Sequence, residues 1–151
     1  SYTMGSQAVD LKIEKKTGKI FINHYYSVFD VGQVINPLQI RGSVLGGVLM
    51  SIGAALYEEV VFDKDGHITN PHFFKYHLPT FKEAPQQTIE FVETPDPVGP
   101  FGARGIGEHS VIGAAPAILN AIYDAIGVDL FEIPATPEKI KNALEARKES
   151  K

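Results

Sequence analysis

The sequence predicts an α+β domain in which antiparallel strands and hairpins pack with two or three helices. Apolar and polar residues alternate near the N-terminus, as in a half-buried strand. Leucine and isoleucine recur at helical spacing over residues 38–59, and Thr136-Pro137 is a strong helix start. Because 151 residues suffice for one hydrophobic core, we expect a single domain over residues 1–151.

The first two elements are expected to form a β-hairpin. Residues 9–13 alternate between apolar and polar, and the polar turn 15–19 contains Gly18, which can adopt positive φ. Residues 20–29 are rich in β-branched and aromatic side chains, which favours a partner strand. Both faces of this second strand are apolar, which predicts burial on both sides.

A long helix is predicted over residues 38–59, although it contains several glycines. They are Gly42, Gly46, Gly47 and Gly53. Each glycine lowers the stability of a helix by ~1 kcal/mol relative to Ala. Glycines at these positions are therefore expected to serve packing or ligand binding. Gly42 and Gly46 are one turn apart and leave room either for a closely packed backbone or for a flat ligand. Both interpretations stay open.

Three further strands are predicted after this helix. Residues 60–62 and 73–78 are rich in apolar and aromatic residues, and 63–66 reads as a turn between strands. Residues 88–93 form the last strand candidate. Three prolines between residues 95 and 100 then enforce an extended loop.

The C-terminal part is expected to be helical. One helix is predicted over residues 115–126, with Pro116 in its first turn and Gly127 as its stop. A last helix begins at Thr136, whose hydroxyl is a good cap, and runs to about Arg147.

Composition excludes several functional classes. The net charge of -4 gives no general basic surface for nucleic acid. No uninterrupted apolar run reaches the ~18 residues of a membrane span, and residues 1–5 do not resemble a signal peptide. The sequence has no cysteine, so thiolate zinc sites and iron–sulfur ligation by this chain are excluded.

The most informative segment is Gly102-Ala-Arg-Gly105-Ile-Gly107-Glu108-His109-Ser110. It lacks the lysine of a Walker phosphate loop, and Ser110 occupies the third glycine position of a dinucleotide fingerprint. Glu108 follows a sharp glycine turn, which suits a positioned base. On spacing alone, Glu108 could equally be a cap or a dipole partner of the following helix.

This glycine pattern resembles the C-terminal part of the molybdenum-binding large subunit of the xanthine dehydrogenase and aldehyde oxidase family. The resemblance also covers Asp30–Pro37, Gly42–Gly47 with Ile52-Gly53, Glu58-Glu59, Tyr76 with Leu78–Thr80, and Glu93–Pro95. It implies a fold like the C-terminal portion of the molybdopterin-binding domain of xanthine dehydrogenase. That subunit is several times longer, so we expect a C-terminal fragment, an expressed domain or a split subunit.

The resemblance implies an oxidoreductase that hydroxylates a purine, aromatic heterocycle or aldehyde with water as the oxygen source. Glu108 matches the catalytic base, and Gly105 and Gly107 shape the turn and face the cofactor. His109 and Ser110 are expected to line the substrate pocket. Arg104 is expected either to form a salt bridge or to pack. The fragment by itself should be inactive.

One departure concerns the cofactor contact from the long helix. Ser43 and Met50 stand where the family usually carries glutamine, and the first of these glutamines contacts the pterin. A serine hydroxyl is shorter than an amide and offers one polar atom instead of two. Two alternatives therefore stay open: a non-catalytic assembly module, and a relative with altered molybdenum chemistry.

The implied cofactor is molybdopterin carrying molybdenum, in the cytosine dinucleotide form. FAD and iron–sulfur clusters would lie on partner subunits or domains, beside the rest of the molybdenum subunit, and we expect a cytoplasmic complex. The only other partner expected is a small-molecule substrate, with no nucleic acid or membrane. No side chain is expected to ligate a metal, because the pterin carries molybdenum and the five histidines form no ligand motif.

Overall fold

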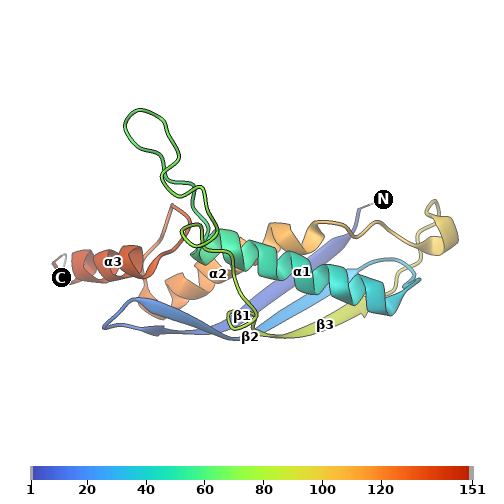
Figure 1. Ribbon diagram of the computed structural model, residues 1–151. Coiled ribbons are helices and arrows are strands. Elements are labelled where there is room, and N and C mark those ends of the chain that lie inside the picture. Colours follow the sequence, from blue (N-terminus) through green and yellow to red (C-terminus); the bar gives the residue numbers. More distant parts are fainter. Residues whose placement is uncertain (1, 150–151) are drawn as a thin grey trace.

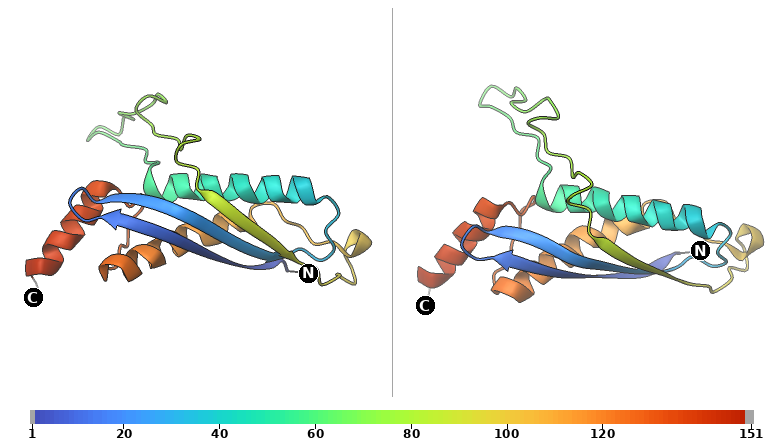
Figure 2. Two further views of the ribbon diagram at one scale, coloured as in Figure 1. Left: turned by 90° about the horizontal axis from the view of Figure 1, so that it is seen from below. Right: turned by 60° about the horizontal axis from the view of Figure 1, so that its bottom comes forward.

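A computed structural model describes residues 2–149. A three-stranded sheet in the order β1-β2-β3 is covered on one face by two long helices, as Figures 1 and 2 show. The elements are β1 (Met4–Glu14), β2 (Lys19–Asp30), α1 (Pro37–Leu56), β3 (Gln86–Val92), the short 3-10 helix η1 (Pro100–Gly102), α2 (His109–Ile126) and α3 (Pro137–Glu149). The predicted α+β class is confirmed. Residues 1, 150 and 151 of the expected domain lie outside the described residues.

The predicted hairpin is present, but only one face of β2 is buried. β1 and β2 are antiparallel, and Gly18 has a φ of 75° in the turn between them. Tyr25 and Phe29 point into the core, whereas Tyr26 on the opposite face is exposed and stacks on His24 at 4.5 Å. The expectation of burial on both sides was therefore wrong, because the described helices cover one face of the sheet.

β3 corrects the prediction that all strands are antiparallel. It pairs with β2 in parallel, with His24 opposite Gln86. After β2 ends at Asp30, α1 and a long loop return the chain to the level of His24 on β2, where β3 begins at Gln86. Parallel neighbours require such a crossover, usually through a helix.

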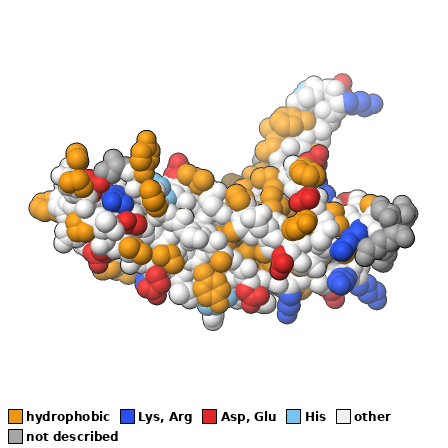
Figure 3. All heavy atoms as spheres, turned by 180° about the vertical axis from the view of Figure 1, so that it is seen from behind, with side chains coloured by type: hydrophobic (Ala, Val, Ile, Leu, Met, Phe, Trp, Pro, Cys, Tyr) orange, Lys and Arg blue, Asp and Glu red, His pale blue; other side chains and the backbone are white. Residues whose placement is uncertain are grey.

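The segment between α1 and β3 is a protruding loop over residues 57–85 (Figures 1 and 3). The strands predicted at 60–62 and 73–78 were wrong. One isolated bridge, Phe62 to Ile68, flanks the turn at 63–66. The apolar residues that suggested strands, such as Phe73 and Phe81, are exposed. Apolar β-formers favour strands only where a pleated surface packs on a neighbour, and the loop stands away from the sheet.

α1 begins at Pro37, where the Asn36 side chain accepts a hydrogen bond from the amide of Gln39 at 3.0 Å. It ends at Leu56, slightly before the predicted end at residue 59. By length and composition α1 is the one helix in residues 2–149 that could span a membrane. Its buried face packs against α2, as in the core helix of a globular domain.

α2 begins at His109, six residues before the predicted start. Pro116 therefore lies inside the helix and not in its first turn, so that prediction was wrong. The start of α2 was not predicted, because the small residues before Pro116 show only weak helical periodicity. Gly127 has the predicted role: it ends α2 in the left-handed conformation at φ 63°.

The core supports a first prediction on stability. Ile118 on α2 is fully buried, whereas Ile112 on the same helix is 73% exposed. Ile118→Ala should lower the free energy of unfolding by about 2–5 kcal/mol, because it removes buried methyl groups and leaves a cavity. Ile112→Ala should change it by less than about 0.5 kcal/mol. Denaturant titration of both variants measures the difference, and equal losses would contradict the packing described here.

Candidate active site

The glycine loop between η1 and α2 is held by the segment that follows β2. Gly32 forms an isolated bridge with Ala103. The amide of Gln33 donates to the carbonyl of Gly102 at 2.9 Å, and the amide of Arg104 donates to the carbonyl of Val31 at 2.8 Å. The Asp-Val-Gly segment, which sequence analysis noted only as a resemblance, therefore forms the main-chain frame of the glycine loop.

Gly32 is a glycine for a steric reason. Its φ is +67°, and a Cβ built on it would lie 2.2 Å from the carbonyl oxygen of Gly102. Residues with a side chain rarely adopt this φ, and the backbone oxygen leaves no room for one. The close approach of these two backbones thus requires glycine at position 32.

Arg104 connects three parts of the chain. Its Nη1 lies 3.0 Å from Oδ2 of Asp30, at the end of β2, and its Nε lies 3.3 Å from Oδ2 of Asp96, in the proline-rich loop. Nη1 also donates to the carbonyl of Tyr2 at 3.3 Å. Of the two alternatives for Arg104, the structure selects the salt bridge, and it forms two.

Both acidic partners are themselves held by backbone amides. Oδ1 of Asp30 accepts from the amides of Gly32 and Thr94 at 3.0 and 3.2 Å. The amide of Gly32 is the main cause that lowers the pKa of Asp30, with Thr94 and Arg104 adding to it against partial desolvation. Oδ1 of Asp96 accepts from two amides of its own loop, each at 2.8 Å. Sequence reasoning missed this cluster, and an arginine inside a glycine loop was its only visible sign.

Glu108 lies directly before α2 and is exposed. Its side chain makes no capping hydrogen bond, while its carbonyl accepts from the amide of Val111 at 2.9 Å. The interpretation of Glu108 as a side-chain cap is therefore wrong. An exposed carboxylate without a capping hydrogen bond is available to accept a proton from a neighbouring group.

The two residues after Glu108 have different environments. Ser110 is 1% exposed, and a Cβ on Gly47 of α1 would lie 2.1 Å from its hydroxyl oxygen. Ser110 therefore packs between the helices, and the prediction that it lines a substrate pocket was wrong. His109, in contrast, lines a depression of about 240 Å³ together with Thr3 and Gln7.

Four glycines near this site face open space. A Cβ on any of them would meet no atom within 4 Å: Gly42, Gly46, Gly105 and Gly107. The packing interpretation of Gly42 and Gly46 is therefore wrong within residues 2–149. Ser43 and Met50 are also exposed on α1. Their spacing of seven residues puts them on one side of the helix, so a flat group could lie along this surface.

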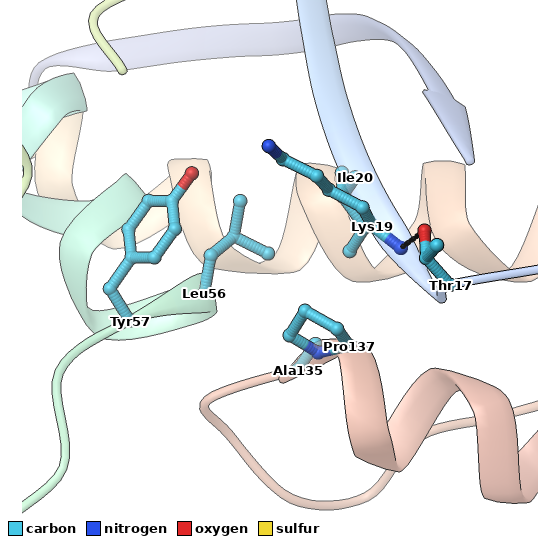
Figure 4. Close-up of a pocket in the computed structure, with 7 residues that line it drawn as sticks. All are labelled: Thr17, Lys19, Ile20, Leu56, Tyr57, Ala135 and Pro137. Atoms are coloured by element: carbon cyan, nitrogen blue, oxygen red, sulfur yellow. Dashed lines mark hydrogen bonds between the residues drawn. The ribbon is translucent and has the colours of Figure 1, made fainter. Parts of the chain in front are cut away.

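Two other features do not form a competing site. Asp63, Asp65 and His67 lie close together on an exposed turn, where Oδ1 of Asp63 accepts from the amides of the other two at 2.9 Å. The turn itself explains their arrangement. A mainly apolar cavity of about 240 Å³ lies at the far end of the domain, between the β1–β2 turn and the start of α3 (Figure 4). No sequence-predicted site residue lines it.

Comparison with known proteins identifies the family of the chain. Residues 1–85 match the molybdopterin cofactor-binding domain family. The chain is 37% identical to the nicotine 6-hydroxylase large subunit of Paenarthrobacter nicotinovorans, over 94% of this chain and 18% of the relative. It is 39% identical to the xanthine dehydrogenase molybdenum-binding subunit of Escherichia coli O157:H7, over 90% of this chain and 18% of the relative.

Solved structures give the same result. Quinoline 2-oxidoreductase from Pseudomonas putida 86 superposes with a TM-score of 0.90 at 33% identity, covering 93% of this chain and 18% of that chain. The aldehyde oxidoreductase of Desulfovibrio gigas gives a TM-score of 0.86 at 32% identity, with 95% and 15% covered. The chain thus spans less than a fifth of the length of these relatives. On the family match and these similarities, the chain belongs to the molybdopterin cofactor-binding domain family and corresponds to part of a molybdenum hydroxylase large subunit.

Proposed function

We propose that this chain supplies the base-bearing part of the active site of a molybdenum hydroxylase. The enzyme would hydroxylate an aromatic heterocycle, a purine or an aldehyde, with water as the oxygen source. The observation that carries the proposal is Glu108, an exposed carboxylate that makes no capping bond and follows a turn held at both ends. The relatives named above, a nicotine hydroxylase and a xanthine dehydrogenase subunit, support the reaction class.

The residues available to hold the cofactor are Gly105, Gly107 and Ser43. The two glycines are exposed, and a Cβ on either would meet no atom within 4 Å, while Ser43 offers an exposed hydroxyl on α1. The bound molybdopterin, proposed in its cytosine dinucleotide form, would supply the two-electron redox chemistry that side chains lack. None of the described side chains is required as a metal ligand in this proposal.

Glu108 acts in this proposal as the general base. A carboxylate oxygen of Glu108 accepts the proton that is lost as water is converted into the attacking oxygen nucleophile. Glu108 lies at the N-terminus of α2, and its side chain is not used as a cap, so it is free for this proton transfer. His109 lies next to it and borders the 240 Å³ depression.

The wider assembly is also part of the proposal. Residues 1–151 would form one domain of the large subunit, and several relatives are themselves named as subunits of such enzymes. We propose that partner subunits or domains carry FAD and iron–sulfur clusters, because electrons must leave the molybdenum site. A cytoplasmic location fits this assembly.

The direct test uses the complete subunit purified with its partners. We expect about one molybdenum and one pterin per subunit, measured by metal analysis and by the fluorescence of the oxidised pterin. Turnover in ¹⁸O-labelled water should place the label in the product. Absence of the pterin, or a product oxygen that does not come from water, would overturn the proposal.

Gly46, which faces open space, gives a prediction in which the free energy of unfolding rises while the pterin content falls. In the isolated domain, Gly46→Ala should raise the free energy of unfolding by about 0.5–1 kcal/mol, because alanine favours a helix and meets no neighbour. In the complete enzyme the added methyl should lower the pterin content, because it fills the surface reserved for the cofactor. Unchanged pterin content would remove Gly46 from the cofactor surface.

The exposed Ser43 and Met50 favour one alternative, a relative with altered molybdenum chemistry. In that case the complete enzyme would contain pterin but would not transfer oxygen from water to the substrate. The same pair of measurements therefore separates the two functions.

A further inference from the structure

The cluster of Arg104 with Asp30 and Asp96 is not used by the proposed reaction, yet it lies four residues before Glu108. We propose that Arg104 is a positioning residue: its two ion pairs hold the start of the glycine loop and so direct the carboxylate of Glu108. This inference rests on the proposed function, because it assigns Arg104 a task in the same active site.

Arg104, Asp30 and Asp96 form a double ion pair, called the clamp, that is shielded from water, unlike an ordinary surface ion pair. The guanidinium uses two different nitrogens for two carboxylates that belong to separate segments of the chain. The side chain of Arg104 is 15% exposed, and that of Asp96 is 2% exposed. Ion pairs that are shielded from water are screened less by salt than surface pairs. The planar fork of the arginine presents separate N–H donors to the two acids, whereas a lysine offers a single point charge.

The turn that carries Glu108 has few other anchors on this side. Gly105 accepts one hydrogen bond, from the hydroxyl of Thr3 at 2.7 Å, and both Gly105 and Gly107 border open space. Beyond Glu108, the chain is held again where Gln7 donates to the carbonyl of Ser110 at 3.0 Å. Ile106, between the two glycines, packs against the hydrophobic core. Because glycines resist bending little, the direction of Glu108 depends on the fixed points at Arg104, Ile106 and Ser110.

Loss of the clamp should affect the chemical step more than substrate binding. A displacement of a catalytic group by about 1 Å can cost on the order of 10²-fold in rate. Arg104→Met in the complete enzyme should therefore lower kcat per molybdenum by about 10²-fold, with KM changed by less than about threefold. Arg104→Lys should recover part of this loss, because it keeps one ion pair.

A second measurement does not depend on activity. Hydrogen exchange of the amides of Gln33 and Val111, which donate to the carbonyls of Gly102 and Glu108 on either side of the loop, should become faster in Arg104→Met, while exchange in α3 stays unchanged. Asp96→Asn offers a milder variant: Oδ1 can still accept from the amides of Val98 and Gly99, and the charge facing Arg104 is lost. If Arg104→Met does not fold, Asp96→Asn decides the question by the same two measurements.

A matched control removes an ion pair elsewhere. Lys139 lies 3.8 Å from Glu132 on an exposed surface, so Lys139→Met should leave both kcat and loop exchange unchanged. Wild-type kcat per molybdenum and wild-type exchange in Arg104→Met, or in Asp96→Asn where the former does not fold, would overturn this inference. If Glu108→Gln retains turnover, the proposed function itself fails. If Glu108→Gln is inactive and Arg104→Met is fully active, only the positioning role fails.

Discussion

Glu108→Gln in the complete enzyme should reduce kcat by about 10²–10⁴-fold, the usual contribution of a general base. The amide has nearly the same shape as the carboxylate but cannot accept the proton. Because Glu108 is exposed and makes no side-chain cap, the substitution should leave α2 and the glycine loop intact. Molybdenum and pterin contents should therefore stay at wild-type values. Steady-state kinetics normalised to molybdenum measures the effect.

Glu138→Gln is the matched control for this variant. Glu138 lies in the first turn of α3, so, like Glu108 at the N-cap of α2, it is an acidic residue at a helix N-terminus, but it is far from the site. Its loss should cost about 0.3–1 kcal/mol of stability and no activity. If Glu108→Gln turns over at a rate close to that of wild type, Glu108 is not the base. If it also loses molybdenum, the residue holds the site together and its catalytic role needs other evidence.

Gly32→Ala should have the second largest effect, because it acts on the frame of the loop. An added Cβ would meet the carbonyl oxygen of Gly102 at 2.2 Å, and neither backbone can move without breaking the bonds between them. We expect a loss of about 10²-fold in kcat through displacement of the loop. The positive φ adds a strain of about 1–2 kcal/mol. Kinetics per molybdenum and the thermal midpoint measure the two parts.

Gly66→Ala separates the strain from the clash. Gly66 also has a positive φ, +84°, but a Cβ on it meets nothing within 4 Å. Gly66→Ala should therefore lose about 1–2 kcal/mol through strain alone and keep its activity. If Gly32→Ala behaves like Gly66→Ala in both measurements, the close backbone approach at Gly32 does not control the site.

Local patterns predicted the elements whose stability is local. The hairpin followed from alternation and from Gly18, and the end of α2 followed from Gly127. The hydroxyl of Thr136 caps the last helix as expected, accepting from the amide of Lys139 at 3.3 Å. In these cases neighbouring residues alone define the required backbone conformation, so the sequence was a sufficient guide.

Predictions failed where the outcome depends on distant neighbours. Residues 73–78 have the composition of a strand but meet no sheet edge, and they lie in the protruding loop. β3 was found at about the right place, yet its parallel pairing depends on the path of α1 and the loop before it. The amino-acid composition of a segment does not identify the strand with which it pairs.

By itself, the sequence identified the glycine loop that ends at Glu108 and a helix after it, because these features lie close together along the chain. Only the tertiary structure decided how that turn is held. Asp30 and Arg104 are 74 residues apart, and Gly32 meets Gly102 across the same gap between β2 and the loop. It also decided which glycines are open and which are packed, since Gly46 and Gly47 are adjacent and only Gly47 faces α2. Ion pairs and close backbone contacts act through space, so their partners become known only when the chain is folded.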